Sequence, residues 1–170
     1  MMKSVASLVF TLLAVLSLAV GSIQAEETTD KPDDANALKG VKQGRVIFDI
    51  NIAEPKKLPL YLMVINETIS DLERQGVKPD VILAFRGKAV MLVSTDQEKV
   101  DLTEVPELEK AAKQIAALQQ RGVRMEACSV ATRLFGVDHA TLLPGIEPVG
   151  NTFVSLIGYQ SQGYAMIPVY

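Results

Sequence analysis

In the stretch Gly122-Val123-Arg124-Met125-Glu126-Ala127-Cys128-Ser129-Val130, a helix stop, a short strand and a helix start follow one another. The strand ends on Cys128, the only cysteine of the sequence, and residues 129–135 look like the first turns of a new helix. A thiol at such a point lies among unpaired backbone N–H groups and near the positive end of a helix dipole, which favours the thiolate. Ligands of open α/β sheets usually bind at this same edge. Cys128 is therefore the candidate reactive residue.

The segments around this stretch alternate between apolar runs and amphipathic runs. Strands are predicted at 46–50, 81–85 and 164–168, and residues 81–85 are apolar throughout, as in a parallel strand covered on both faces. Helices are predicted at 59–75, from Pro106 to Gly122, and after Asn151 or Thr152. Residues 89–93 fit either a strand or a short helix, and residues 136–150 are expected to be irregular. This alternation predicts an α/β fold, a three-layer sandwich with a mainly parallel sheet of about five strands.

The first 25 residues have the pattern of a secretory signal peptide. A basic start is followed by an apolar run from Val5 to Val20 and by a small residue, Ala25, at the expected cleavage point. The run is shorter than the roughly 20 residues that a membrane-spanning helix needs. We therefore expect cleavage after Ala25 and no membrane span in the mature chain; an uncleaved anchor is the alternative. Residues 26–44 are polar and acidic and predict a flexible leader, so the domain is expected at 45–170.

Composition and motifs exclude several classes of function. With a formal net charge of −3, the chain has no electrostatic basis for binding nucleic acid. It contains neither a G-x-G-x-x-G fingerprint nor a P-loop, so no nucleotide cofactor is expected. A single cysteine cannot form an internal disulfide, and with the single histidine, His139, it cannot build a structural zinc site. No cofactor and no metal are predicted.

A set of short motifs in the carboxyl-terminal half is shared with a known family. They are Gly122-Val123 through Cys128, Ala131-Thr132-Arg133, Gly136-Val137, Leu142-Leu143-Pro144-Gly145 and Gln162-Gly163-Tyr164-Ala165-Met166-Ile167. With these motifs the chain after Gly44 resembles the DsrE/DsrF-like (YchN-like) family. The resemblance implies a flavodoxin-like domain that assembles into homotrimers or homohexamers. In the sulfur-relay members, a cysteine at the position of Cys128 carries a persulfide and passes sulfur to a partner protein.

Other side chains at the same predicted sheet edge could complete a pocket around Cys128. Arg86 and Lys88 flank Gly87 at one strand end and could make the pocket electropositive. Asp49 and Asn51 at the end of the first strand could hydrogen-bond a ligand. The simpler interpretation is that these are ordinary solvated loop residues.

Three residues near Cys128 in the sequence have alternative interpretations. Glu126 and Arg124 share the cysteine's face of the strand if alternation holds. The carboxylate would oppose thiolate formation and the arginine would favour it, unless the two pair with each other or reach solvent. His139 could serve as a base for the thiol, or lie in a surface loop.

The leading hypothesis is an exported, periplasmic sulfur-handling protein that carries or transfers sulfane sulfur as a persulfide on Cys128. A sulfur donor or acceptor protein would then be its partner, beside its own copies. The competing hypothesis is a non-enzymatic oligomeric binding protein of the periplasm in which Cys128 only packs in the core. A third is a redox sensor that forms an inter-chain Cys128 disulfide.

Overall fold

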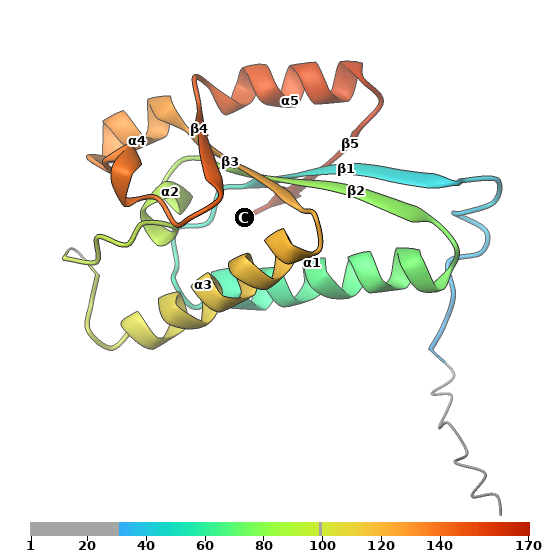
Figure 1. Cartoon of the computed structure of the whole chain (residues 1–170), viewed down its shortest axis with the longest axis horizontal. Helices are drawn as coiled ribbons and strands as arrows, with labels where there is room; N and C mark the ends of the chain where they lie inside the picture. Colours follow the sequence, from blue (N-terminus) through green and yellow to red (C-terminus); the bar gives the residue numbers. More distant parts are fainter. Residues whose placement is uncertain (1–30, 99) are drawn as a thin grey trace, which may run out of the picture. The chain divides into compact units, whose positions relative to one another are not determined.

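The computed structural model describes residues 31–98 and 100–170. The predicted signal peptide and the first residues of the predicted leader lie outside this part of the chain. The elements follow in the order β1 (Gln43–Ile50), α1 (Lys57–Arg74), β2 (Lys78–Phe85), α2 (Ala89–Leu92), α3 (Val105–Gln120), β3 (Arg124–Cys128), α4 (Ser129–Phe135), the 3-10 turn η1 (His139–Thr141), β4 (Ile146–Val149), α5 (Thr152–Ser161) and β5 (Ala165–Val169) (Figure 1).

The strands form one parallel sheet in the order β4-β3-β2-β1-β5. Because all strands run in the same direction, their carboxyl ends share one edge. The register aligns Ile50 with Phe85 and Phe85 with Ala127, so that Cys128 directly follows the last paired residue of β3 with β2. The predicted α/β fold with a parallel sheet of five strands is confirmed.

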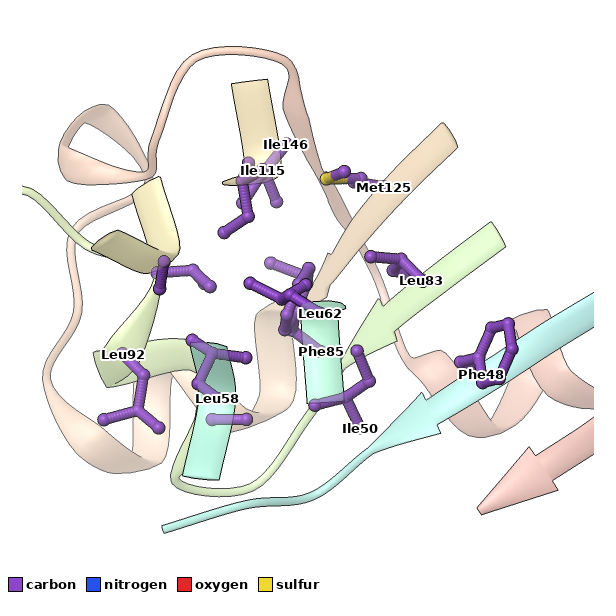
Figure 2. Packing of buried hydrophobic residues seen from close by; sticks show 14 of the residues in the cluster. Phe48, Ile50, Leu58, Leu62, Leu83, Phe85, Leu92, Ile115, Met125 and Ile146 are labelled. Atoms are coloured by element: carbon purple, nitrogen blue, oxygen red, sulfur yellow. The ribbon is translucent and has the colours of Figure 1, made fainter. Parts of the chain in front are cut away.

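The larger core lies between the sheet and the helices α1 and α3, on one face of the sheet (Figure 1). Buried residues of α1 recur at helical spacing, which turns a single apolar stripe toward the strands. Figure 2 shows Leu58 and Leu62 of this stripe near Ile50 and Phe85 of the sheet. Close packing of this kind fixes the strand ends that carry the candidate site.

The opposite face of the sheet is covered by α5 (Figure 1). Its core is small, with Leu156 packed against Ile47, Ile82 and Ala84. The three layers are therefore unequal, and much of the apolar surface of α5 stays exposed. None of the helices in the described ranges is long and apolar enough to cross a membrane.

The structure settles one open prediction of secondary structure and corrects another. Residues 89–93 form the short helix α2 and not a strand. Residues 136–150, expected to be irregular throughout, contain β4, which pairs with β3. This strand has only four residues, and its middle residues Glu147 and Pro148 are exposed. An edge strand tolerates proline because one side of its backbone needs no partner, and that is why its sequence lacks an apolar strand pattern.

Candidate functional site

Cys128 lines a small cavity at the carboxyl edge of the sheet. The residue is only 5% exposed, and the cavity has a volume of about 230 Å³. Its walls come from the turn after β2, from α4 and from the start of α5, namely Arg86, Gly87, Val130, Ala131, Leu134, Phe135, Asn151, Thr152 and Phe153. Most of these side chains are apolar, so the sulfur faces a small and largely apolar space.

The start of α5 supplies a hydrogen-bond donor to the sulfur. The backbone N–H of Thr152 donates to Sγ of Cys128 across 3.5 Å. Asn151 precedes the helix, and its side chain accepts a hydrogen bond from the N–H of Phe153 at 2.9 Å. The side-chain amide of Asn151 thus caps the N–H of Phe153, whereas the N–H of Thr152 stays available for the sulfur of Cys128.

The pKa of the Cys128 thiol lies below its ordinary value. Burial is the largest influence and raises this pKa, but hydrogen bonds outweigh it. They come from the side chain and backbone of Thr152 and from the backbone N–H groups of Ala131 and Val130. The thiolate, which is the nucleophilic form of cysteine, is therefore favoured here.

The hydroxyl of Thr152 is the least satisfied polar group of the cavity wall. The residue is 0% exposed, and Oγ1 completes no hydrogen bond with the described part of the chain. It nevertheless lies near enough to the sulfur to lower the thiol pKa. A buried hydroxyl without a full partner costs free energy. The Thr152 hydroxyl is therefore a candidate hydrogen-bond donor to the Cys128 thiolate, or to a sulfur atom bound to it.

Arg86 reaches the cavity, but most of its guanidinium is used by Asp49. Nε lies 2.5 Å from Oδ1 and Nη2 lies 2.8 Å from Oδ2, and Asp49 is buried. The pKa of Arg86 is raised, first by its hydrogen bond to Asp49, with burial opposing. The guanidinium also lies over the ring of Phe153, 5.4 Å from its centroid. Arg86 therefore lines the cavity together with Cys128, whereas Asp49 lies outside the cavity wall and holds the guanidinium of Arg86.

Gly87 lines the cavity, whereas Asn51 and Lys88 do not. Gly87 has a φ of +54°, and a Cβ at this position would collide with Oδ1 of Asn51. The glycine therefore lets the first strand end approach the second closely. Lys88 is exposed at the start of α2 and projects no charge into the cavity wall.

Glu126 belongs to a different cluster. Oε1 accepts a hydrogen bond from the hydroxyl of Tyr159 at 2.7 Å, and Oε2 has no partner among the described residues. Arg124 pairs with Asp80 at 2.8 Å instead of with Glu126, which corrects the expected alternative of a pair within the strand. Glu126 borders other hollows and does not line the Cys128 cavity.

The Glu126 cluster also contains a tyrosine that sequence reasoning missed. Burial and the hydrogen bond to Glu126 raise the pKa of Tyr159 to about 12. Tyr159 packs edge to face against Tyr164, with ring centroids 5.2 Å apart. This cluster holds α5 onto β3 and so supports the position of Thr152 at the other end of the helix.

His139 does not form a pair with Cys128. Its Nε2 lies 2.9 Å from the hydroxyl of Thr132, in an open hollow lined by neighbours of the η1 turn. Across residues 31–98 and 100–170, no group of three or more His, Cys, Asp or Glu side chains is placed to hold a metal ion.

Sequence reasoning also did not identify the cavity residues of α4 and of the start of α5, which are Val130, Ala131, Leu134, Phe135, Asn151, Thr152 and Phe153. A helix cap at Asn151 or Thr152 was readable from the sequence, and it was the one available signal. Since α5 follows β4 and β4 ends beside Cys128, recognising β4 would have placed this cap at the cysteine.

The sequence model of the DsrE/DsrF-like family matches residues 45–169. The chain therefore belongs to the DsrE/DsrF-like family, members of which are often linked to sulfur relay.

The chain is also similar to individual proteins. An uncharacterized protein of Aquifex aeolicus (strain VF5) is 23% identical over 125 residues, which are 73% of this chain and 55% of that protein. The chain thus matches about half the length of this relative. The structure of MTH1491, a protein of unknown function from Methanobacterium thermoautotrophicum, matches with a TM-score of 0.59 at 23% identity. The match covers 74% of this chain and 98% of the MTH1491 chain. The YchN protein of E. coli has a TM-score of 0.48 at 15% identity, over 75% and 99%. The likeness to MTH1491 supports the fold.

Proposed function

We propose that this protein carries sulfane sulfur as a persulfide on Cys128. The observation that carries the proposal is the setting of the sulfur: the N–H of Thr152 lies 3.5 Å from Sγ, and the thiol pKa is lowered although the residue is buried. A nucleophilic sulfur needs a stabilised thiolate together with space for the incoming atom. The cavity of about 230 Å³ supplies that space.

The chemistry needs no oxidant. The Cys128 thiolate attacks the outer sulfur of a donor persulfide R–S–SH, so that a new S–S bond forms to Cys128 and the donor's S–S bond breaks. The donor leaves as the thiolate R–S⁻, and Cys128 becomes the persulfide. Attack by an acceptor thiolate on the outer sulfur reverses these steps and frees Cys128. The protein would therefore act as a carrier or sulfurtransferase component.

A packing role for Cys128 explains less. A core cysteine has no need of a hydrogen-bond donor or of an adjacent cavity. The sensor alternative is disfavoured because Cys128 is 5% exposed, and an inter-chain disulfide requires the two Cα atoms to approach within about 7 Å.

Self-association into a homo-oligomer is part of the proposal. The exposed face of α5 presents Phe153, Val154 and Ile157, which are 58%, 65% and 66% exposed. Exposed apolar surface of this kind is typical of interaction sites. Replacing Ile157 by glutamate should lower the molar mass measured by sedimentation; an unchanged mass would contradict a role of this face. The periplasm remains the proposed compartment, and the mass of the mature chain purified from that compartment would test cleavage after Ala25.

The direct test of the carrier is the intact mass of the protein after exposure to elemental sulfur, an uncharged sulfane-sulfur donor. We expect a reducible gain of whole sulfur atoms in the native protein and none in a Cys128→Ser variant. The absence of any adduct, with a thiol that resists alkylation until the protein is unfolded, would assign Cys128 to the core.

A further inference from the structure

The walls of the Cys128 cavity determine which sulfur donors can reach the thiolate. Among the described residues, only Arg86 and Cys128 give the cavity wall a titratable side chain, and Leu134, Phe135 and Phe153 make much of it apolar. An ion that enters such a space loses its hydration and needs a counter-charge in return. The net charge of the groups around the cavity therefore decides whether a charged sulfur donor can enter.

The available positive charge is already matched. Arg86 donates through Nε and Nη2 to both carboxylate oxygens of Asp49, so the formal charges of these two groups cancel. When Cys128 is a thiolate, the three groups together carry one net negative charge. The cations nearest in the sequence to Arg86 and Cys128 do not line the cavity, since Lys88, Arg124 and Arg133 are all exposed and lie outside its wall. An anionic donor would thus meet an apolar wall and a net negative charge.

The polar groups that face the sulfur suit a single developing charge. The N–H of Thr152 already contacts Sγ, and the fully buried Thr152 hydroxyl has no complete hydrogen bond within the described ranges. Together they can stabilise one negative charge that moves from the thiolate to the terminal sulfur of a persulfide. They offer no second cation for a donor that brings charges of its own.

We infer that the Cys128 cavity selects uncharged, apolar sulfane-sulfur donors, such as elemental sulfur or an organic polysulfane, over anionic donors such as thiosulfate. This inference rests on the proposed function. With elemental sulfur, the thiolate attacks one ring atom, one S–S bond forms to Cys128, and one ring S–S bond breaks. The product is the chain Cys–S–S₈⁻, in which the electron pair stays on the terminal sulfur and from which acceptor thiolates can take sulfane sulfur. Atoms and electrons balance without another reactant.

The test uses three reagents with the same reacting group. Ethyl, sulfonatoethyl and trimethylammonioethyl methanethiosulfonate are neutral, anionic and cationic. Each transfers its alkylthio group to the thiolate, so that a Cys–S–S–R bond forms and methanesulfinate leaves. Rates at Cys128 are divided by the rates with a small uncharged model thiol at the same pH, which removes the intrinsic reactivity of each reagent.

We expect the normalised rate of the anionic reagent to be slower than that of the neutral one by about tenfold or more. If the anionic and the cationic reagent are slowed equally, the cavity still selects uncharged donors. The selection would then come from the apolar walls and not from the net negative charge. An anionic reagent that reacts as fast as the neutral one would overturn the inference.

A charge placed at the cavity rim provides a matched variant. Leu134 lines the cavity and is 71% exposed, so Leu134→Lys adds a cation without disturbing the core. This variant should raise the rate of the anionic reagent severalfold, whereas Leu102→Lys, at a position 87% exposed and outside the cavity, should not. No difference between the two variants would overturn the charge argument.

The outcome separates this inference from the carrier function. A protein that shows the expected reagent order but gains no sulfane sulfur on Cys128 from elemental sulfur has the proposed selectivity and is not a carrier. A protein that forms the persulfide equally well from elemental sulfur and thiosulfate, after the same normalisation, is a carrier without the proposed selectivity.

Discussion

The guanidinium of Arg86 holds both carboxylate oxygens of Asp49, with Nε 2.5 Å from Oδ1 and Nη2 2.8 Å from Oδ2. The pair links the ends of β1 and β2 directly beside Cys128. Removing one partner of a buried ion pair leaves an unmatched charge, so Asp49→Asn should lower the free energy of unfolding by about 3 kcal/mol. Denaturant unfolding monitored by circular dichroism measures this change.

The matched control is the exposed pair of Glu73 with Arg121, in which the glutamate side chain is 53% exposed. Glu73→Gln should cost less than about 1 kcal/mol because solvent screens the pair. Equal losses in the two variants would mean that the Asp49–Arg86 pair has no special structural weight.

The Thr152 hydroxyl favours the thiolate of Cys128, and its removal should be visible in the pH dependence of alkylation. A depressed thiol pKa means that the thiolate persists to lower pH than in a free cysteine. In Thr152→Val, the midpoint of the alkylation rate should move up toward the ordinary value, since the burial that raises the pKa is then less opposed. Thr152→Ser, which keeps the hydroxyl, should retain the original midpoint.

Stability separates this effect from misfolding. The Thr152 hydroxyl makes no complete hydrogen bond within the described ranges, so a methyl group in its place should leave the free energy of unfolding unchanged or raise it. A midpoint that is the same in the native protein and in Thr152→Val would show that the hydroxyl does not act on the sulfur.

Substitution of Gly87 is expected to destabilise the fold. Its φ of +54° disfavours other residues, and a Cβ would collide with Oδ1 of Asn51. Gly87→Ala should therefore destabilise the fold by about 1–2 kcal/mol from the backbone conformation alone, with the collision in addition. The double variant Gly87→Ala with Asn51→Ala should recover only the stability lost through the collision, and not the part lost through the backbone conformation.

Gly158 in α5 provides the opposite case, because a Cβ there meets nothing within 4 Å. Gly158→Ala should be neutral or stabilising by up to about 1 kcal/mol, as expected in a helix interior. Thermal unfolding of the three variants side by side tests the assignment, and a Gly87→Ala protein as stable as Gly158→Ala would refute it.

Tyr159 should titrate late and stabilise the protein in a defined pH window. Its pKa is raised to about 12 by burial and by the hydrogen bond to Glu126. The fold favours the protonated phenol, so its contribution to stability is complete below the ordinary value of about 10 and is lost as pH rises toward 12. The pKa of Tyr164 is also raised, by burial and by its hydrogen bond to Asp80, so its titration is delayed too. Tyrosinate absorbance should therefore lose one of its late titrations, the one near pH 12, in Tyr159→Phe.

The same substitution tests the support of α5. Tyr159→Phe leaves Oε1 of the buried Glu126 without its donor and should cost about 1–3 kcal/mol at neutral pH. Tyr61→Phe, which removes an exposed 3.3 Å contact, should cost less. A Tyr159→Phe protein that is as stable as Tyr61→Phe would show that the cluster does not anchor the helix.

The sequence predicted the fold where a local pattern was strong. The apolar run at 81–85 and the helical spacing of residues 59–75 each correspond to an element, and Cys128 lies at the strand end expected of it. The short edge strand β4 escaped because Glu147 and Pro148 interrupt any apolar pattern. The strand β4 forms by pairing with β3, and this pairing is a property of the assembled sheet that the local sequence does not reveal.

Side-chain partners were less accessible from the sequence for the same reason. Arg124 reaches Asp80 across the sheet, and Glu126 reaches Tyr159 on α5, at separations of 44 and 33 residues. Alternation along one strand places Arg124 and Glu126 on the same face, but strand register and helix docking decide their partners. Thr152 contacts Cys128 through docking of the same helix.

The central claim is that Cys128 both accepts a sulfane sulfur and gives it up, and cyanolysis tests both steps together. The protein is loaded with elemental sulfur, freed of excess donor and treated with cyanide, which removes the added sulfur atoms one after another as thiocyanate until the Cys128 thiolate is regenerated. We expect thiocyanate in proportion to the protein, none from Cys128→Ser, and reloading of the recovered protein. Absence of thiocyanate from native protein whose thiol remains unmodified would contradict the carrier account.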